Sequence, residues 1–163
     1  HGLKTKESLA LTGDYGNKKK LNQEEIKDIK RKRNSNVSWL NENWIYKEIH
    51  PYIHKANRDA GWNFNWDRSE KCQFTKYKKD QYYDWHCDSW NKPYKENKNG
   101  SGGKIRNYDP HKREETRHVK KATEILSKGS IIVFPSFVWH RVKPVLEGTR
   151  YSLVLWNLGY PYK

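Results

Sequence analysis

The spacing of the apolar residues changes at Gly61, and this change constrains the fold more than any other feature of the chain. Before it, residues 39–60 carry an apolar side chain at every third or fourth position. That is the spacing of an amphipathic helix. After it, apolar and polar residues alternate in short runs, as along half-buried strands. Helices followed by strands predict an α+β domain with an antiparallel β-sandwich or barrel.

Local signals set the expected element bounds. Residues 21–33 predict a short charged helix, with Asn22 as N-cap and Glu25 as its capping-box partner. In the longer helix, Pro51 is expected to kink or split the helix, and Gly61 to end it. Residues 91–117 are rich in Gly, Asn and Lys and predict a loop. Strands are expected over residues 62–66, 72–77, 82–88, 119–125, 129–135, 138–142 and 150–158. The last two are expected to pair as antiparallel neighbours joined through residues 147–149.

Length and composition limit the class of protein. A chain of 163 residues fits one domain. It contains no run of about 18 apolar residues, so the sequence predicts no membrane-spanning helix. The first 20 residues have no apolar signal core, and two cysteines are too few for a disulfide framework. We therefore expect a cytoplasmic protein. The net charge of +14 makes a nucleic-acid partner conceivable, but the lysines are spread along the chain, which disfavours it.

Two segments carry residues suited to metal binding. His86 and Asp88 are two apart on an expected strand, so their side chains leave the same face. His140 follows the apolar run 134–139. A polar side chain buried there needs a bonding partner, because its burial without one costs free energy. Two imidazoles and one carboxylate are the donor set of a mononuclear non-haem Fe(II) site with open coordination positions. Each segment taken singly has another explanation. His86 and Asp88 could be a surface histidine beside a solvated aspartate, and His140 could be a hydrogen-bonded core histidine.

A third segment suits the binding of a carboxylate. Arg150 and Ser152 share one face of an expected strand. An inward guanidinium needs an anion, because its unpaired burial costs several kcal/mol. That anion could be the carboxylate of a ligand, held by two parallel hydrogen bonds. It could also be the side chain of an internal Asp or Glu.

Five short segments together resemble a known family, namely residues 73–77 (Gln-Phe-Thr-Lys-Tyr), 83–88 (Tyr-Asp-Trp-His-Cys-Asp), 134–136 (Phe-Pro-Ser), 140–142 (His-Arg-Val) and 148–152 (Gly-Thr-Arg-Tyr-Ser). The family is the prolyl-4-hydroxylase-like branch of the 2-oxoglutarate/Fe(II) oxygenases, and more narrowly its small bacterial and phage hydroxylases. The resemblance covers about residues 37–160. It implies a double-stranded β-helix (jelly-roll) core over about 61–160, with the N-terminal helices of about 20–60 packed on one side.

The resemblance also implies roles for single residues. Iron would be held by His86, Asp88 and His140. The distal carboxylate of 2-oxoglutarate would be bound by Arg150 and Ser152. Tyr77 matches the family's tyrosine on the 2-oxoglutarate side, and Tyr83 the one on the substrate side. Apart from the resemblance, Trp90 could line a groove for the substrate, with packing in the core or sheet as the alternative.

The implied activity is hydroxylation of a protein or peptide side chain, with proline first, in a bacterial or phage-infected host cell. Fe(II) would be the cofactor, 2-oxoglutarate and O2 the cosubstrates, succinate and CO2 the by-products, and ascorbate a candidate reductant. Two alternatives stay open. One is oxidative demethylation of a nucleic-acid base, with the lysines contacting phosphates. The other is a non-enzymatic basic nucleic-acid-binding module whose histidines are structural or bind zinc.

One departure from the family pattern concerns the stretch between the two metal segments. There the family has a strand, an acidic turn, a Gly-Gly pair and another strand, whereas here Arg106 runs straight into Asn107. A jelly-roll without those strands would have an open edge. We therefore expect that a segment of the natural chain is missing near residues 106/107 of an otherwise single domain, 1–163.

Overall fold

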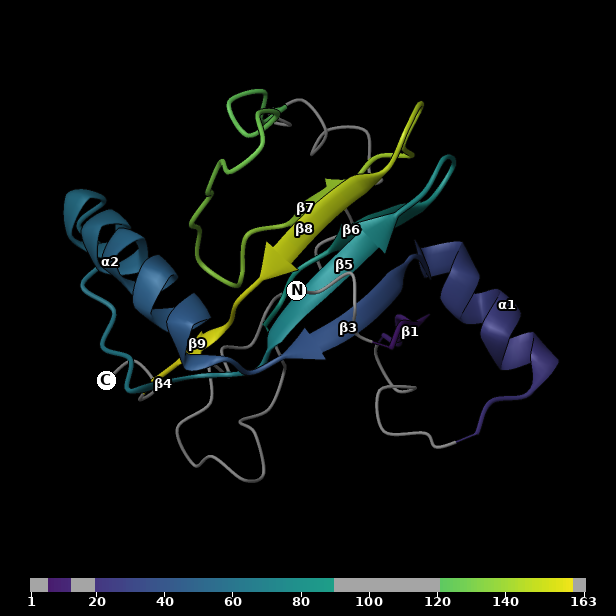
Figure 1. Ribbon diagram of the computed structural model, residues 1–163, viewed down its shortest axis with the longest axis horizontal. Helices are drawn as coiled ribbons and strands as arrows, with labels where there is room; N and C mark the ends of the chain where they lie inside the picture. Colours follow the sequence, from purple (N-terminus) through teal and green to yellow (C-terminus); the bar gives the residue numbers. More distant parts are fainter. Residues whose placement is uncertain (1–5, 13–19, 90–120, 160–163) are drawn as a thin grey trace. The chain divides into compact units, whose positions relative to one another are not determined.

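The structure is a computed structural model that describes residues 6–12, 20–89 and 121–159. These residues form helices and antiparallel sheets (Figure 1), so the predicted α+β class is confirmed. The elements in chain order are β1 (Ser8–Leu9), α1 (Gln23–Lys32), β2 (Arg33–Asn34), β3 (Asn36–Leu40), α2 (Asn43–Asp59), β4 (Arg68–Ser69), β5 (Cys72–Tyr77), β6 (Tyr82–His86), β7 (His140–Val142), β8 (Arg150–Val154) and β9 (Asn157–Leu158).

Contacts along the chain divide it into two compact units. The first unit comprises His1–Asn43, Arg68–His86 and His140–Asn157 and contains both larger sheets. The second comprises Trp44–Asp67, Cys87–Trp139 and Leu158–Lys163 and contains nearly all of α2. The segments of the first unit are far apart in the sequence, so its sheets are made by long-range pairing.

A four-stranded sheet with the order β1-β3-β5-β8 lies in the first unit (Figure 1). Its central strand β5 has the bounds expected from the sequence, residues 72–77. Successive side chains of a strand point to opposite faces, and on β5 the buried residues Gln73, Thr75 and Tyr77 share one of them. The antiparallel register sets Thr75 opposite Ser152 and Tyr77 opposite Arg150.

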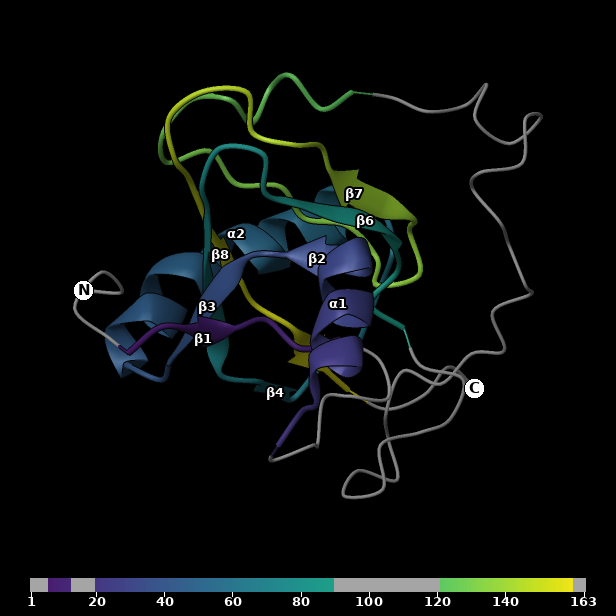
Figure 2. The same cartoon turned by 90° about the vertical axis from the view of Figure 1, so that its right-hand side faces the viewer.

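A three-stranded sheet with the order β2-β6-β7 is the other sheet of this unit (Figure 2). Arg33 pairs with Tyr83, and further along β6 His86 pairs with His140. Tyr83 itself pairs with Val142, so three steps on β6 oppose two steps on β7. Such an irregularity is a β-bulge, and the extra residue shifts the alternation of side chains. Because of it, Tyr83 and His86 point to the same face although they are three residues apart.

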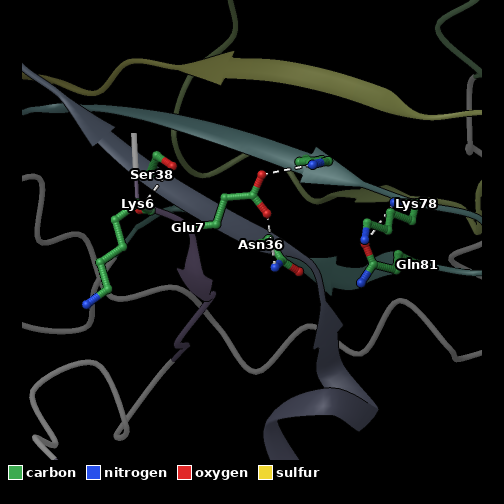
Figure 3. Close-up of polar contacts among 7 residues, drawn as sticks. Lys6, Glu7, Asn36, Ser38, Lys78 and Gln81 are labelled. Carbon is green, nitrogen blue, oxygen red and sulfur yellow. Dashed lines mark hydrogen bonds and ion pairs between the residues drawn. The ribbon is translucent and has the colours of Figure 1, made fainter. Parts of the chain in front are cut away.

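The N-terminal edge of the four-stranded sheet is fixed by polar contacts (Figure 3). A carboxylate oxygen of Glu7 is 2.9 Å from Lys76 Nζ, and its other oxygen accepts from Asn36 Nδ2 at 3.3 Å. The Ser38 hydroxyl donates to the carbonyl of Lys6 at 3.3 Å. These bonds attach β1, which is only two residues long, to β3 and β5.

Helix α1 begins as the sequence predicted. Asn22 accepts from the Glu25 N–H at 2.8 Å, and the Glu25 carboxylate accepts from the Asn22 N–H at 3.0 Å. Both bonds of a capping box are therefore present. At the other end the N–H of Arg33 donates to the carbonyl of Ile29, which is fully buried. The chain thus passes from α1 directly into β2.

The longer helix differs from its prediction at its start. Residues 36–40 form β3 and pair with β5, so α2 begins at Asn43 and the predicted start at residue 39 is wrong. The apolar residues at 39 and 40 belong to a sheet, where tertiary pairing outweighs the helical spacing. Pro51 lies inside α2 without dividing it into two elements. Gly61 follows the helix end with a φ of 64°, the left-handed conformation typical of a helix C-terminus.

Several strand predictions are wrong. Residues 62–66 form no strand, because Asn63 has a φ of 55°, which extended backbone does not allow. Neither do residues 121–125 and 129–135. The C-terminal prediction, residues 150–158, is divided into β8 and β9. The expected β7–β8 hairpin is also wrong, because β7 pairs with β6 and β8 pairs with β5. Residues 119–120, the loop 91–117 and the junction 106/107 lie outside the described residues.

Candidate active site

Two histidines from distant parts of the sequence are neighbours in the sheet. His86 ends β6 and His140 begins β7, and the antiparallel register sets them directly opposite each other. Directly opposed residues project to the same face. Their ring centroids are 4.1 Å apart, with the ring planes 59° apart. The pairing of two strands therefore brings the imidazoles of two sequence motifs together.

Asp88 lies two residues beyond the end of β6. Its backbone N–H donates to the carbonyl of Ser136 at 2.8 Å, and the hydroxyls of Ser89 and Ser136 are 2.7 Å apart. Ser136 starts a turn closed by a bond from the Val138 N–H to the Pro135 carbonyl. Two hydrogen bonds to this turn thus hold the backbone that carries the carboxylate.

The three side chains can surround one ion. One ligand atom from each of His86, Asp88 and His140 lies within 4.8 Å of the others. The Nδ1 atom of His86 is 2.7 Å from the carbonyl oxygen of Asp84, so Nδ1 carries the proton and Nε2 is the ring nitrogen that could bind a metal. Two imidazoles and one carboxylate leave coordination positions open, as a non-haem Fe(II) centre requires. The group could therefore hold Fe(II).

Arg150 provides a buried donor atom that no group among the described residues satisfies. It begins β8 opposite Tyr77, and its guanidinium carbon is 5.4 Å from the centroid of the Tyr77 ring. The Nη1 atom is buried and has no hydrogen-bond partner among the described residues. Buried donors without a partner are rare in folded proteins. The geometry therefore fits an anionic ligand at this atom.

The other residues expected to bind 2-oxoglutarate share this face of the sheet. Ser152 is two residues beyond Arg150 on β8 and lies opposite Thr75, so the two β8 side chains project together. Tyr77 is 2% exposed. Tyr77, Arg150 and Ser152 thus lie on one patch of the β5–β8 pair.

Of the two residues expected on the substrate side, the structure describes Tyr83 but not Trp90. The Tyr83 ring lies parallel to the His86 imidazole, with centroids 3.5 Å apart and planes 10° apart. Trp90 lies outside the described residues. Sequence reasoning missed Arg33, which is 6% exposed and stacks on Tyr83. It ends a run of charged residues typical of a solvated helix, and no local sequence pattern indicates its burial.

Two further histidines form an aromatic cluster in the second unit. His50 and His54 of α2 both pack on Trp66, with ring centroids 4.9 and 4.6 Å from it. Burial, and secondarily the nearby His54, hold the pKa of His50 below its usual value of 6.5. The cluster contains no carboxylate. In the part of the chain that the structure describes, His86, Asp88 and His140 form the group that could hold a metal.

Comparisons with known proteins place the chain in a family. Residues 72–157, just over half of the chain, match the model of the 2OG-Fe(II) oxygenase superfamily. The match spans β5 to the first residue of β9 and contains every candidate ligand described above. No curated protein and no solved structure gave a match. No helix among the described residues is long and apolar enough to cross a membrane. The chain belongs to the 2OG-Fe(II) oxygenase superfamily and is a 2-oxoglutarate- and Fe(II)-dependent dioxygenase.

Proposed function

We propose that this dioxygenase hydroxylates a side chain of a protein or peptide, with a prolyl ring as the first candidate, and that it adopts the jelly-roll fold of its superfamily. The reaction class follows from the family. The substrate rests on the resemblance of five motifs to the prolyl-4-hydroxylase-like branch.

His86, Asp88 and His140 are the proposed iron ligands. Their ligand atoms lie within 4.8 Å of one another, and the bond between His86 Nδ1–H and the Asp84 carbonyl makes Nε2 the nitrogen that would bind the ion. Bound Fe(II) supplies the activation of O2 that couples conversion of 2-oxoglutarate to succinate and CO2 with insertion of one oxygen atom into a C–H bond. The protein fixes the ligands, orients the cosubstrate and excludes water.

Arg150 is the proposed anchor of the distal carboxylate of 2-oxoglutarate. The single observation that carries this assignment is its buried Nη1 atom, which has no hydrogen-bond partner within residues 6–12, 20–89 and 121–159. A carboxylate there would neutralise the guanidinium and satisfy the donor. The Ser152 hydroxyl, on the same face of β8, would donate to the same carboxylate. Tyr77 would close the other side of this pocket, because it packs under the guanidinium.

The substrate would approach the iron beside Tyr83, whose ring covers His86. A second candidate function is oxidative demethylation of a nucleic-acid base. One observation favours it, namely a basic hollow lined by Lys27, Lys30, Arg31 and Tyr82. Such a hollow could accept a phosphate. These side chains come from α1 and β6 of the same unit.

The test is succinate formation by the purified chain with Fe(II), 2-oxoglutarate and O2. We expect turnover that is lost in His140→Ala and Asp88→Ala and kept in Asp67→Asn, an exposed carboxylate outside the site. Absence of succinate from an Fe(II)-loaded, folded wild-type chain would refute the proposal.

The substrate is tested by mass spectrometry of a peptide library. A gain of one oxygen on a proline-containing peptide is expected. Release of formaldehyde from methylated single-stranded DNA, with no modified peptide, would replace the peptide substrate by the nucleic-acid one. In that case Lys30→Glu should weaken turnover of the methylated DNA, because it removes one of the basic side chains that line the hollow.

A further inference from the structure

Arg33 is a buried cation whose partners in the described chain are all uncharged. Its Nε donates to the Ser35 hydroxyl at 3.0 Å. Its Nη2 donates to the side-chain oxygen of Gln73 and, at 3.4 Å, to the Thr75 hydroxyl. Gln73 and Thr75 belong to β5, whereas Arg33 belongs to β2. The side chain therefore joins the two sheets of the first unit.

A buried guanidinium is normally paired with a carboxylate, because an isolated charge is costly to remove from water. No carboxylate of the described residues bonds to Arg33, and its charge lies over an aromatic ring instead. The guanidinium carbon is 4.5 Å from the centroid of the Tyr83 ring. A cation stacked on an aromatic face is attracted by the ring quadrupole, most strongly when both are desolvated. This contact of the Arg33 guanidinium therefore stabilises the position of the Tyr83 ring.

Tyr83 connects Arg33 to the candidate metal ligands. The His86 imidazole lies parallel to the Tyr83 ring at 3.5 Å and covers one face of it. A guanidinium over the same ring must therefore occupy the opposite face. The β-bulge of β6 makes this possible, since it brings Tyr83 and His86 to the same side. The result is a continuous stack of Arg33, Tyr83 and His86, with His140 next to it.

We propose that Arg33 is a positioning residue of the metal centre and acts through Tyr83 to hold the plane of the His86 imidazole. This inference rests on the proposed iron site. Two contacts of the His86 ring matter for its orientation: its Nδ1–H bond to Asp84 and its stacking on Tyr83. The hydrogen bond directs Nε2 toward the proposed metal position, and the stacking keeps the ring from tilting. The guanidinium, itself fixed by three hydrogen bonds, keeps Tyr83 from moving away.

Charge and position predict opposite effects, which makes the proposal testable. A positive charge near a divalent ion disfavours metal binding. If Arg33 acted only through its charge, removing it would therefore tighten metal binding. Loss of a support for a ligand weakens metal binding, by about 10- to 100-fold for partners one step removed from the metal. Weaker binding in Arg33→Met therefore indicates positioning. Arg33→Lys should also bind more weakly, because it keeps the charge but not the planar face.

The experiment measures Co²⁺ binding to the full chain by calorimetry, with the visible Co²⁺ spectrum as a readout of ligand geometry and no turnover required. We expect Arg33→Met and Tyr83→Leu each to weaken binding about 10-fold or more. Tyr83→Phe should bind like wild type, because the ring stack is kept. The double variant Arg33→Met/Tyr83→Leu should bind no more weakly than Tyr83→Leu alone, since both changes break one pathway.

Arg141→Met is the matched control. Arg141 stacks over Trp85, with its guanidinium carbon 4.8 Å from the ring centroid. It adjoins His140 on β7 and therefore points to the other face of the same strand pair. Removing this stack should leave Co²⁺ affinity unchanged. Circular dichroism checks that each variant folds. Should Arg33→Met be unfolded, the cycle is run with Arg33→Lys.

The outcomes separate this inference from the proposed function. Failure of wild type to bind Co²⁺ would overturn the metal site itself. Binding by wild type together with unchanged or tighter binding by Arg33→Met would overturn only the role of Arg33. Equal losses from Arg33→Met in the wild-type and Tyr83→Leu backgrounds would show that Arg33 does not act through Tyr83, and would also overturn the inference.

Discussion

Arg150 and Tyr77 face each other across β5 and β8, with the guanidinium carbon 5.4 Å from the ring centroid. Tyr77 is almost wholly buried, so its ring removes water from one side of the guanidinium. The Nη1 atom is buried and has no hydrogen-bond partner in the part of the chain that the structure describes. An unsatisfied buried donor costs free energy until a ligand pairs with it. Ligand binding and folding stability should therefore be linked at this residue.

Replacing Arg150 by Met should abolish stabilisation by 2-oxoglutarate. A ligand that binds only the folded state raises the free energy of unfolding, by about 2.7 kcal/mol at one hundred times its Kd. We expect a rise in the melting temperature of wild type with Mn²⁺ and increasing 2-oxoglutarate, and none in Arg150→Met. Without ligand, the variant should be at least as stable as wild type, because a buried donor atom that has no partner among the described residues is removed. Differential scanning fluorimetry measures both.

Arg58→Met, at an exposed arginine of α2, is the control and should keep the full shift. A normal 2-oxoglutarate shift in Arg150→Met would mean that the distal carboxylate binds elsewhere.

The Glu7–Lys76 ion pair should make stability depend on pH in the acid range. The hydrogen bond from Lys76 holds the pKa of Glu7 below its ordinary value of 4.5. The folded state therefore binds this proton less readily than the unfolded state. The stabilisation is present above the ordinary pKa and is lost as the pH falls through the folded pKa. Urea unfolding between about pH 5 and about pH 3 should show a shallower loss of stability in Glu7→Gln than in wild type.

Two controls bound this prediction. Glu48→Gln, at an exposed carboxylate of α2, should follow wild type. High salt should shrink the difference between wild type and Glu7→Gln, because the pair is partly exposed to solvent. Parallel pH profiles for wild type and Glu7→Gln would contradict the assignment.

His50 should contribute a second pH dependence at a higher pH. Burial lowers its pKa below 6.5, and the charge of His54 adds to the effect. The unfolded state then binds the proton more readily, so stability is fully present above about pH 6.5 and falls as the pH decreases below it. His50→Phe keeps an aromatic ring beside Trp66 and removes the titration. Its unfolding free energy should fall less than that of wild type between about pH 7.5 and about pH 5.

Ile29 should be the residue of α1 on which the docking of this helix depends most. It is fully buried, and α1 contacts β2 and β6 of the same unit. Ile29→Ala should lower the free energy of unfolding by about 2–5 kcal/mol, as expected for a truncated core aliphatic residue. Ile26→Ala, at a half-exposed position of the same helix, should cost clearly less. Equal costs in chemical denaturation would show that α1 does not pack through Ile29.

Local signals in the sequence determined the parts of this protein that depend on neighbouring residues. The capping box of Asn22 and Glu25 and the bounds of β5 followed from the spacing of a few side chains. The proposal that His86, Asp88 and His140 hold a metal and that Arg150 binds a carboxylate also came from residue type and local context. Strand pairing did not, because the β7–β8 hairpin suggested by proximity in sequence is replaced by pairing with β6 and β5.

Only the tertiary structure decided where Arg33 lies and which face Tyr83 presents. In the sequence, Arg33 ends a charged helix and looks solvated, whereas the fold buries it against β5 and the Tyr83 ring. Strict alternation along β6 would put Tyr83 and His86 on opposite faces, and one extra residue opposite β7 reverses this. The physical reason is that burial and register are set by contacts between segments distant in the chain, and no local pattern encodes them.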